Sequence, residues 1–126
     1  MRPAIVILAL ALAACSSDVA PEQAALARAQ AALARAGQAD AMVLAPLFGL
    51  DAVGQAGLCG LLETPAGPVR LVVALRDGTV RLGKPLAQQR LRQDLGESRF
   101  CTLAARARWQ RQAAADPNGL VAELGD

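Results

Sequence analysis

The clearest hydrophobic pattern in the chain is an alternation of apolar and polar residues in its middle third. Short runs rich in Val and Leu are separated by Pro and Gly, as expected for half-buried strands joined by tight turns. A sheet of only three strands needs helices on its apolar face to be stable. We therefore predict a three-stranded antiparallel meander, with strands at 58–63, 69–76 and 79–82.

The last two predicted strands are separated by Asp77-Gly78, a pair that is typical of a two-residue hairpin turn. Such a turn would pair Arg76 with Thr79 and Leu75 with Val80. Alternation along the strands then assigns residues to two faces of the sheet. The core face would carry Leu71, Val73 and Leu75, and Arg70, Arg76 and Arg81 would lie on or near the other face.

A helix is predicted from Pro21 to Gly37, because Pro is typical of a first helical turn and Gly of a helix end. Within it the hexapeptide Ala-Ala-Leu-Ala-Arg-Ala occurs twice, seven residues apart. This shift places Leu26 and Leu33 on one face. The helix either packs on its own domain or associates with another helix. The same shift aligns Arg28 with Arg35.

Two further helices are predicted after the sheet, one from Pro85 to about Leu95 and one from about 98 to 115, before Asp116-Pro117-Asn118-Gly119 ends it. In the second, helical periodicity turns Trp109 away from the other large residues. Trp109 then either packs under another segment or marks a contact surface. The predicted inward residues of the first helix are Leu86 and Leu91. Those of the second helix are Phe100, Leu103, Ala104 and Ala107, with Cys101 at the edge of their face.

The segment Met42–Val53 contains seven large apolar residues, but it fits neither the helical nor the strand period, and Pro46 and Gly49 interrupt it. We interpret it as a broken core segment, with a membrane-facing or lipid-binding patch as the alternative. The glycines of 54–60 and Gly83 match no nucleotide-binding pattern and are interpreted as turn residues.

Composition narrows the possible functions. The 126 residues are 54% hydrophobic but only 2% aromatic, and 29 of them are Ala, so the core is built from small side chains. There is no His, which removes the usual general base and the commonest metal ligand. No spacing of Ser, Thr, Lys or carboxylates suggests a nucleophile with its base. We therefore expect no catalytic residues, no metal and no cofactor, and interpret the chain as a non-enzymatic protein. The predicted helices and antiparallel strands assign it to the α+β class.

Charge is distributed unevenly along the chain. Residues 69–111 contain ten basic and three acidic side chains, whereas the segments on either side are net acidic. Arginine forks suit phosphate and carboxylate groups, although a simply solvated basic face has the same composition. The near absence of aromatic residues argues against nucleic acid. The arginines taken as possible anion contacts are Arg70, Arg76, Arg81, Arg90, Arg99 and Arg106.

The N-terminus has the pattern of a secretory signal. Arg2 supplies a positive charge, and eleven apolar residues follow from Ala4 to Ala14. A helix of this length covers roughly 16 Å, about half of the hydrocarbon core of a bilayer, so it is too short for a permanent span. We predict that this segment is removed.

The end of the apolar run, Leu12-Ala13-Ala14-Cys15, resembles the lipobox of bacterial lipoproteins, in which the Cys is acylated and the chain is cut just before it. The alternative is ordinary cleavage after Ala13. The resemblance implies a signal peptide at 1–14, a lipid-anchored tether at 15–21 and a periplasmic domain at 22–126. Ser16 after the Cys favours the outer membrane.

If Cys15 carries lipid, Cys59 and Cys101 remain as a pair in an oxidising compartment, where a disulfide is the usual state. It would close a loop of 43 residues. Two reduced thiols are the alternative, and a redox-catalytic pair is disfavoured because the spacing is not Cys-x-x-Cys.

Together these observations predict a small lipid-anchored envelope protein with a structural role or a role in contacting a protein or the cell wall. The alternative is a periplasmic binder of an anionic or lipidic ligand, which would use the Arg-rich face and Met42–Val53. Expected partners are the membrane, through the lipid on Cys15, and an envelope protein, peptidoglycan or an anionic lipid, but not nucleic acid.

Overall fold

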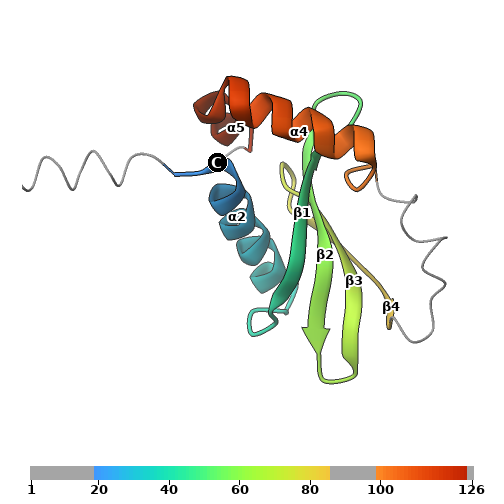
Figure 1. Ribbon diagram of the computed structural model, residues 1–126. Coiled ribbons are helices and arrows are strands. Elements are labelled where there is room, and N and C mark those ends of the chain that lie inside the picture. Colours follow the sequence, from blue (N-terminus) through green and yellow to red (C-terminus); the bar gives the residue numbers. More distant parts are fainter. Residues whose placement is uncertain (1–18, 86–98, 125–126) are drawn as a thin grey trace, which may run out of the picture.

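The computed structural model describes residues 19–85 and 99–124. It contains an N-terminal helix, a four-stranded antiparallel sheet of order β1-β2-β3-β4, and two C-terminal helices (Figure 1). The predicted α+β class is confirmed, with one strand more than expected. The elements are α2 (Pro21–Arg35), β1 (Val43–Leu50), β2 (Ala56–Thr64), β3 (Gly67–Ala74), β4 (Thr79–Pro85), α4 (Leu103–Ala115) and α5 (Pro117–Glu123).

The additional strand, β1, comes from the Met42–Val53 segment that fits no single period. Its register against β2 shifts between Leu44 and Leu47, where three steps along β1 match two along β2. This bulge reverses the alternation, so Val43 and Phe48 pair with β2 residues of the same face although they are five residues apart. Because β1 is an edge strand, it tolerates Pro46, which has no N–H for the ladder.

Within the bulge Ala45 has a positive φ of 49°. On the neighbouring strand, a Cβ added at Gly60 would lie 2.9 Å from the carbonyl oxygen of Leu44. Gly60 lies within β2 and makes room for the bulge. The prediction that it is a turn residue is therefore wrong. Of the glycines in 54–60, Gly54 does lie in a loop, with a φ of 87°.

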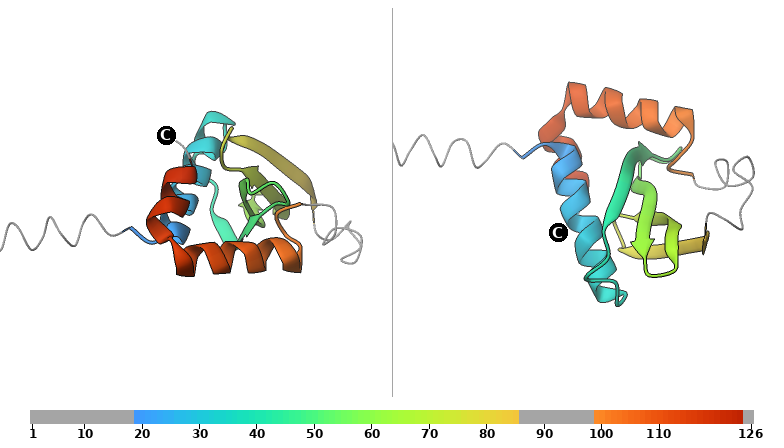
Figure 2. Two further views of the ribbon diagram at one scale, coloured as in Figure 1. Left: turned by 90° about the horizontal axis from the view of Figure 1, so that it is seen from above. Right: turned by 60° about the horizontal axis from the view of Figure 1, so that its bottom comes forward.

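Helix α2 packs along one face of the sheet, and α4 crosses its end (Figures 1 and 2). The interpretation that α2 packs on its own domain is confirmed. The helix ends at Arg35, and Gly37, the residue predicted to end it, follows with a positive φ of 82°. Small side chains let the helix approach the sheet closely. The core between them contains Ala25, Ala29, Ala32, Leu33, Leu58, Leu62, Val69, Leu71, Val73 and Leu75.

The β3–β4 hairpin lies where it was predicted, but its register is wrong by two residues. Ala74, not Arg76, pairs with Thr79. Fully buried Leu75 donates its N–H to Ala56, at 3.1 Å, and the N–H of Gly78 closes the turn on Ala74, at 2.9 Å. A shift of two keeps every side chain on its face, so Leu71, Val73 and Leu75 are buried as expected.

Helix α4 begins later than predicted, because the side chain of Thr102 caps it by accepting from the N–H of Ala105 at 3.0 Å. Phe100 therefore precedes the helix and cannot define its inward face. Ala105 and Trp109 are buried, and Leu103 is 82% exposed, so the predicted face was wrong. Ala104 is exposed and Ala107 half-buried.

Trp109 packs inside the domain. Its ring stacks on Phe48 with the centroids 5.3 Å apart, and its Nε1 donates to Glu22 Oε1 at 3.1 Å. These contacts join α4 to β1 and to the first turn of α2. Of the two alternatives for Trp109, packing under another segment is confirmed.

Cys59 and Cys101 form the predicted disulfide, with their Cα atoms 6.0 Å apart. It ties the segment before α4 to β2. Beside it, a Cβ added at Gly57 would lie 2.0 Å from Cγ of Phe100, so this strand glycine provides the space that the ring fills. Gly57 was also predicted to be a turn residue, and that prediction was wrong. Gly83 likewise lies within β4.

The C-terminal turn sequence ends α4 and starts α5. Asp116 caps the new helix by accepting from the N–H of Gly119 at 3.0 Å, and Leu120 and Leu124 are buried. The helix predicted after Pro85, to about Leu95, the leader at 1–14 and Cys15 lie outside the described residues. Within 19–85 and 99–124, no helix has the length and hydrophobicity needed to cross a membrane.

Candidate functional site

The arginines predicted as anion contacts lie in three regions of the molecule. Arg81 pairs with Val72, so it shares the sheet face opposite α2 with Arg70. Arg76 lies at the β3–β4 turn beside α2, whereas Arg99 precedes α4 and Arg106 lies on it. Arg90 lies outside the described residues. Of the five described arginines, Arg76 therefore lies apart from the sheet face that carries Arg70 and Arg81.

Arg99 takes part in a structural contact that the sequence did not reveal. Its Nε lies 3.0 Å from Oδ2 of the buried Asp51, while the guanidinium side chain is 59% exposed. The other oxygen, Oδ1, accepts from the backbone N–H groups of Val53 at 3.0 Å and Gln55 at 2.8 Å. Asp51 therefore holds the β1–β2 loop together and connects it to the segment before α4.

This arrangement predicts a loss of stability for Asp51→Ala. Two loop amides would lose their acceptor, and we expect the free energy of unfolding to fall by about 2 kcal/mol. Asp51→Asn keeps an oxygen acceptor and loses only an ion pair with an exposed partner, so it should cost less than about 1 kcal/mol. Urea denaturation followed by circular dichroism measures both. Equal losses in the two variants would contradict the role of the loop amides.

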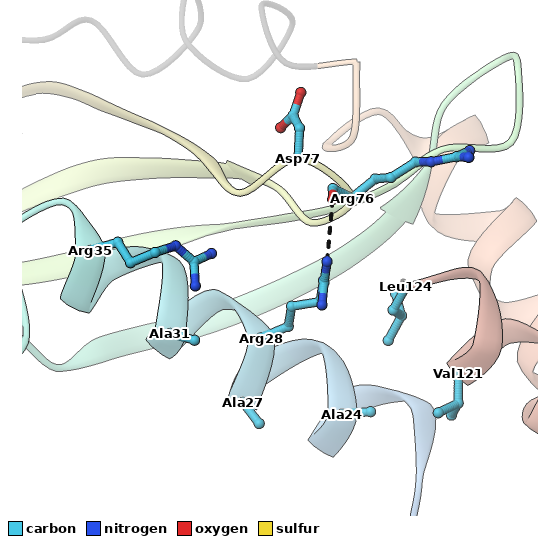
Figure 3. A pocket seen from close by; sticks show the side chains of 9 residues that line it. All are labelled: Ala24, Ala27, Arg28, Ala31, Arg35, Arg76, Asp77, Val121 and Leu124. Carbon is cyan, nitrogen blue, oxygen red and sulfur yellow. Dashed lines mark hydrogen bonds between the residues drawn. The ribbon is translucent and has the colours of Figure 1, made fainter. Parts of the chain in front are cut away.

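A groove of about 690 Å³ lies between α2, α5 and the β3–β4 turn (Figure 3). Its size lies within the range of small-molecule sites. One wall is a helix face of small residues, and the other walls carry apolar and charged side chains. The lining residues are Ala24, Ala27, Arg28, Ala31, Arg35, Arg76, Asp77, Val121 and Leu124.

Arg28 is held in place on the groove wall by the hairpin turn. Its Nε donates to the carbonyl oxygen of Leu75 at 2.7 Å, and its Nη2 donates to that of Arg76 at 3.2 Å. These carbonyl partners leave the positive charge uncompensated. A guanidinium has five N–H donors, so others remain for a ligand. Arg28 is thus a preorganised cation at the centre of the groove.

Arg35 lies two helical turns further along the same wall. A Cβ added at Gly78 would come within 2.8 Å of Nη2 of Arg35, so the glycine leaves space for this guanidinium. Within the described ranges, neither Arg28 nor Arg35 forms an ion pair with a carboxylate. Figure 3 shows both side chains directed toward the turn. The two charges are therefore available to one anionic ligand.

Asp77 is the one carboxylate that lines the groove. The backbone N–H of Thr79, 2.9 Å from Oδ1, and next the Thr79 hydroxyl hold the pKa of Asp77 below its ordinary value of 3.8. Asp77 is therefore ionised at neutral pH. In Figure 3 its carboxylate points away from α2, so it does not lie between the two guanidinium groups.

The groove changes from cationic to apolar along α2. Arg35 lies toward the C-terminal end of this helix, whereas Ala24 lies near its N-terminal end, opposite Val121 and Leu124 of the C-terminal segment (Figure 3). Alanine side chains on the helix keep this end open. The arrangement can hold a molecule that has a negative group at one end and an apolar body.

Among the described residues, no Ser, Thr, Cys or Lys side chain lines the groove. Among residues 19–85 and 99–124, no group of three or more metal-ligating side chains could hold a metal ion.

The sequence contained one sign of this site. The repeated hexapeptide places Arg28 and Arg35 seven residues apart, although they were not among the predicted anion contacts. Of the five predicted arginines that the structure describes, only Arg76 lines the groove, and Figure 3 shows its side chain extending away from Arg28 and Arg35. The other proposed ligand-binding segment, Met42–Val53, contributes no lining residue.

Comparison of the chain with protein-family models, with curated proteins and with solved structures finds no match.

Proposed function

We propose that this chain is a small lipid-anchored protein of a bacterial envelope, exposed to the periplasm and held at the outer membrane, which contacts another envelope component and catalyses no reaction. The observation that carries the proposal is Leu12-Ala13-Ala14-Cys15 at the end of an apolar run that follows Arg2. The disulfide between Cys59 and Cys101 is consistent with it, because disulfides persist in oxidising compartments.

The anchoring proposal predicts a change of location for Cys15→Ser. The wild-type protein should sediment with membranes and resist extraction by salt, since acyl chains insert into the bilayer. The variant cannot be acylated at this position, and its mature form, or its uncleaved precursor, should carry no acyl group. Fractionation combined with metabolic labelling by a fatty-acid analogue measures both properties. Label retained by Cys15→Ser would contradict the proposal.

The proposed contact role is tested by crosslinking in intact cells. A protein that acts by interaction should yield one dominant adduct with an envelope component, and this adduct should be reduced when Cys15→Ser removes the anchor. A diffuse set of adducts that does not change with the anchor would contradict a specific contact.

A second function, binding of an anionic or lipidic ligand, is favoured by the groove. Its volume of about 690 Å³ is large enough for a small ligand, and it combines two uncompensated guanidinium groups with an apolar end. Organic extraction of the protein purified from membranes, followed by mass spectrometry, tests for a bound ligand. Protein without any stoichiometric extractable molecule would favour the contact role alone.

A further inference from the structure

We propose that the groove between α2, α5 and the β3–β4 turn is a binding site for a single-chain anionic amphiphile of the fatty-acid class, with its carboxylate at Arg28 and Arg35. This inference rests on the second proposed function and names the site and the chemical class of its ligand. It is independent of whether Cys15 carries lipid.

The cationic end of the groove is formed by Arg28 and Arg35, which lie on one helix wall. Two turns of α-helix separate their Cα atoms by roughly 10 Å, a span that two long side chains bridge toward a common group. Arg28 is fixed by the carbonyl oxygens of Leu75 and Arg76. Arg35 occupies the space beside Gly78. A carboxylate placed between them would receive charge-assisted hydrogen bonds.

The other end of the groove is apolar. Ala24, Ala27 and Ala31 follow one face of α2, and Val121 and Leu124 oppose the end of this row. An alkyl chain lying along this row would remove from water the exposed side chains of Ala27 and Ala31 and the half-buried side chain of Val121. A small inorganic anion would use only the guanidinium end, and a neutral hydrocarbon only the alanine end.

The groove is therefore complementary to a ligand that joins both chemistries in one molecule. A monocarboxylate with one alkyl chain fits better than a phosphodiester with two chains, because the volume of about 690 Å³ is shared with an opening to solvent.

The test uses the mature chain from residue 15 with Cys15→Ser, so that no attached acyl group competes. The buried core residues of the described ranges lie between Pro21 and Leu124, and this chain retains them together with the disulfide cysteines. Sodium dodecanoate, below its micellar concentration, is titrated into the protein and binding is measured by calorimetry. Sodium acetate tests the head group alone, and dodecyltrimethylammonium tests the same chain with the opposite charge.

Two groove variants are compared with two matched surface variants on α4. Arg35→Gln removes one guanidinium and should weaken dodecanoate binding about tenfold, the loss of one charge-assisted hydrogen bond. Ala27→Trp fills the groove from an exposed position and should abolish binding. Arg111→Gln and Ala114→Trp make the same changes at exposed positions of α4. Their affinity for dodecanoate should stay within about twofold of that of the protein with an unaltered groove.

Saturable one-to-one binding of dodecanoate, with acetate and the cationic amphiphile at least about tenfold weaker, supports the proposal. Absence of saturable binding overturns it, and so does equal binding of either comparison compound. Unchanged affinity in Arg35→Gln overturns the site even if Ala27→Trp does not fold. If dodecanoate does not bind but another molecule is extracted from the membrane-purified protein, the proposed ligand-binding function is supported and the fatty-acid class of ligand is contradicted.

Discussion

Removal of the disulfide by Cys59→Ala with Cys101→Ala is expected to lower the free energy of unfolding by about 4 kcal/mol. The two residues are separated by 42 positions, so the crosslink restricts a long loop in the unfolded chain. Domains of this size have a total stability of roughly 5–15 kcal/mol, which makes this loss a large fraction. The melting temperature should fall by about 15–20 °C.

The measurement is thermal and urea denaturation followed by circular dichroism, with and without a thiol reductant. Reductant should reduce the stability of the wild-type protein to nearly that of the double variant, and it should leave the double variant unchanged. A loss below about 1 kcal/mol, or a reductant effect in the double variant, would contradict the role assigned to this crosslink.

Trp109→Ala is expected to cost about 3–5 kcal/mol. The side chain is 2% exposed, stacks on Phe48 and donates a hydrogen bond to Glu22. Its removal would leave a cavity where α4, β1 and α2 meet. Trp109→Phe keeps an aromatic ring and should recover more than half of the loss.

Leu103→Ala is the matched comparison, because it truncates another large apolar side chain of the same helix. Leu103 is exposed, so we expect a change within about 0.5 kcal/mol. Trp109 is the single Trp of the chain, so denaturation of the Trp109 variants must be followed by circular dichroism. A larger loss of unfolding free energy for Leu103→Ala than for Trp109→Ala would contradict the assignment of the inward face of α4.

Much of the fold could be predicted from local patterns. The strand positions of β2, β3 and β4 follow from alternation, and the ends of α2 follow from Pro21 and Gly37. The elements that were missed depend on irregular backbone. β1 contains a bulge at Ala45 that reverses its alternation, so no regular period describes the strand.

The face of α4 was wrong for a related reason. Sequence periodicity assumes one continuous helix, but Thr102 caps the helix after Phe100. Phe100 then packs against Gly57 of β2, a contact between residues far apart in the chain. The angles between residues within a helix do not depend on where the helix begins. The error arose because the inward face was assigned from Phe100, which lies outside the helix.

The candidate site was less predictable than the fold. Spacing alone aligned Arg28 with Arg35, but the groove also needs Val121, Leu124 and the β3–β4 turn, which only the tertiary structure brings beside α2. The Arg-rich composition of residues 69–111 suggested a single basic face. In the structure Arg99 instead pairs with Asp51, and Arg108 donates to the carbonyl oxygen of Leu50 at 3.2 Å.

The intact mass of the mature protein purified from membranes tests the central proposal most directly. The proposal predicts a chain that begins at Cys15, carries acyl chains on that residue and lacks two hydrogens because of the Cys59–Cys101 disulfide. An unmodified chain that begins at Ala14 would contradict lipid anchoring, whatever the groove binds.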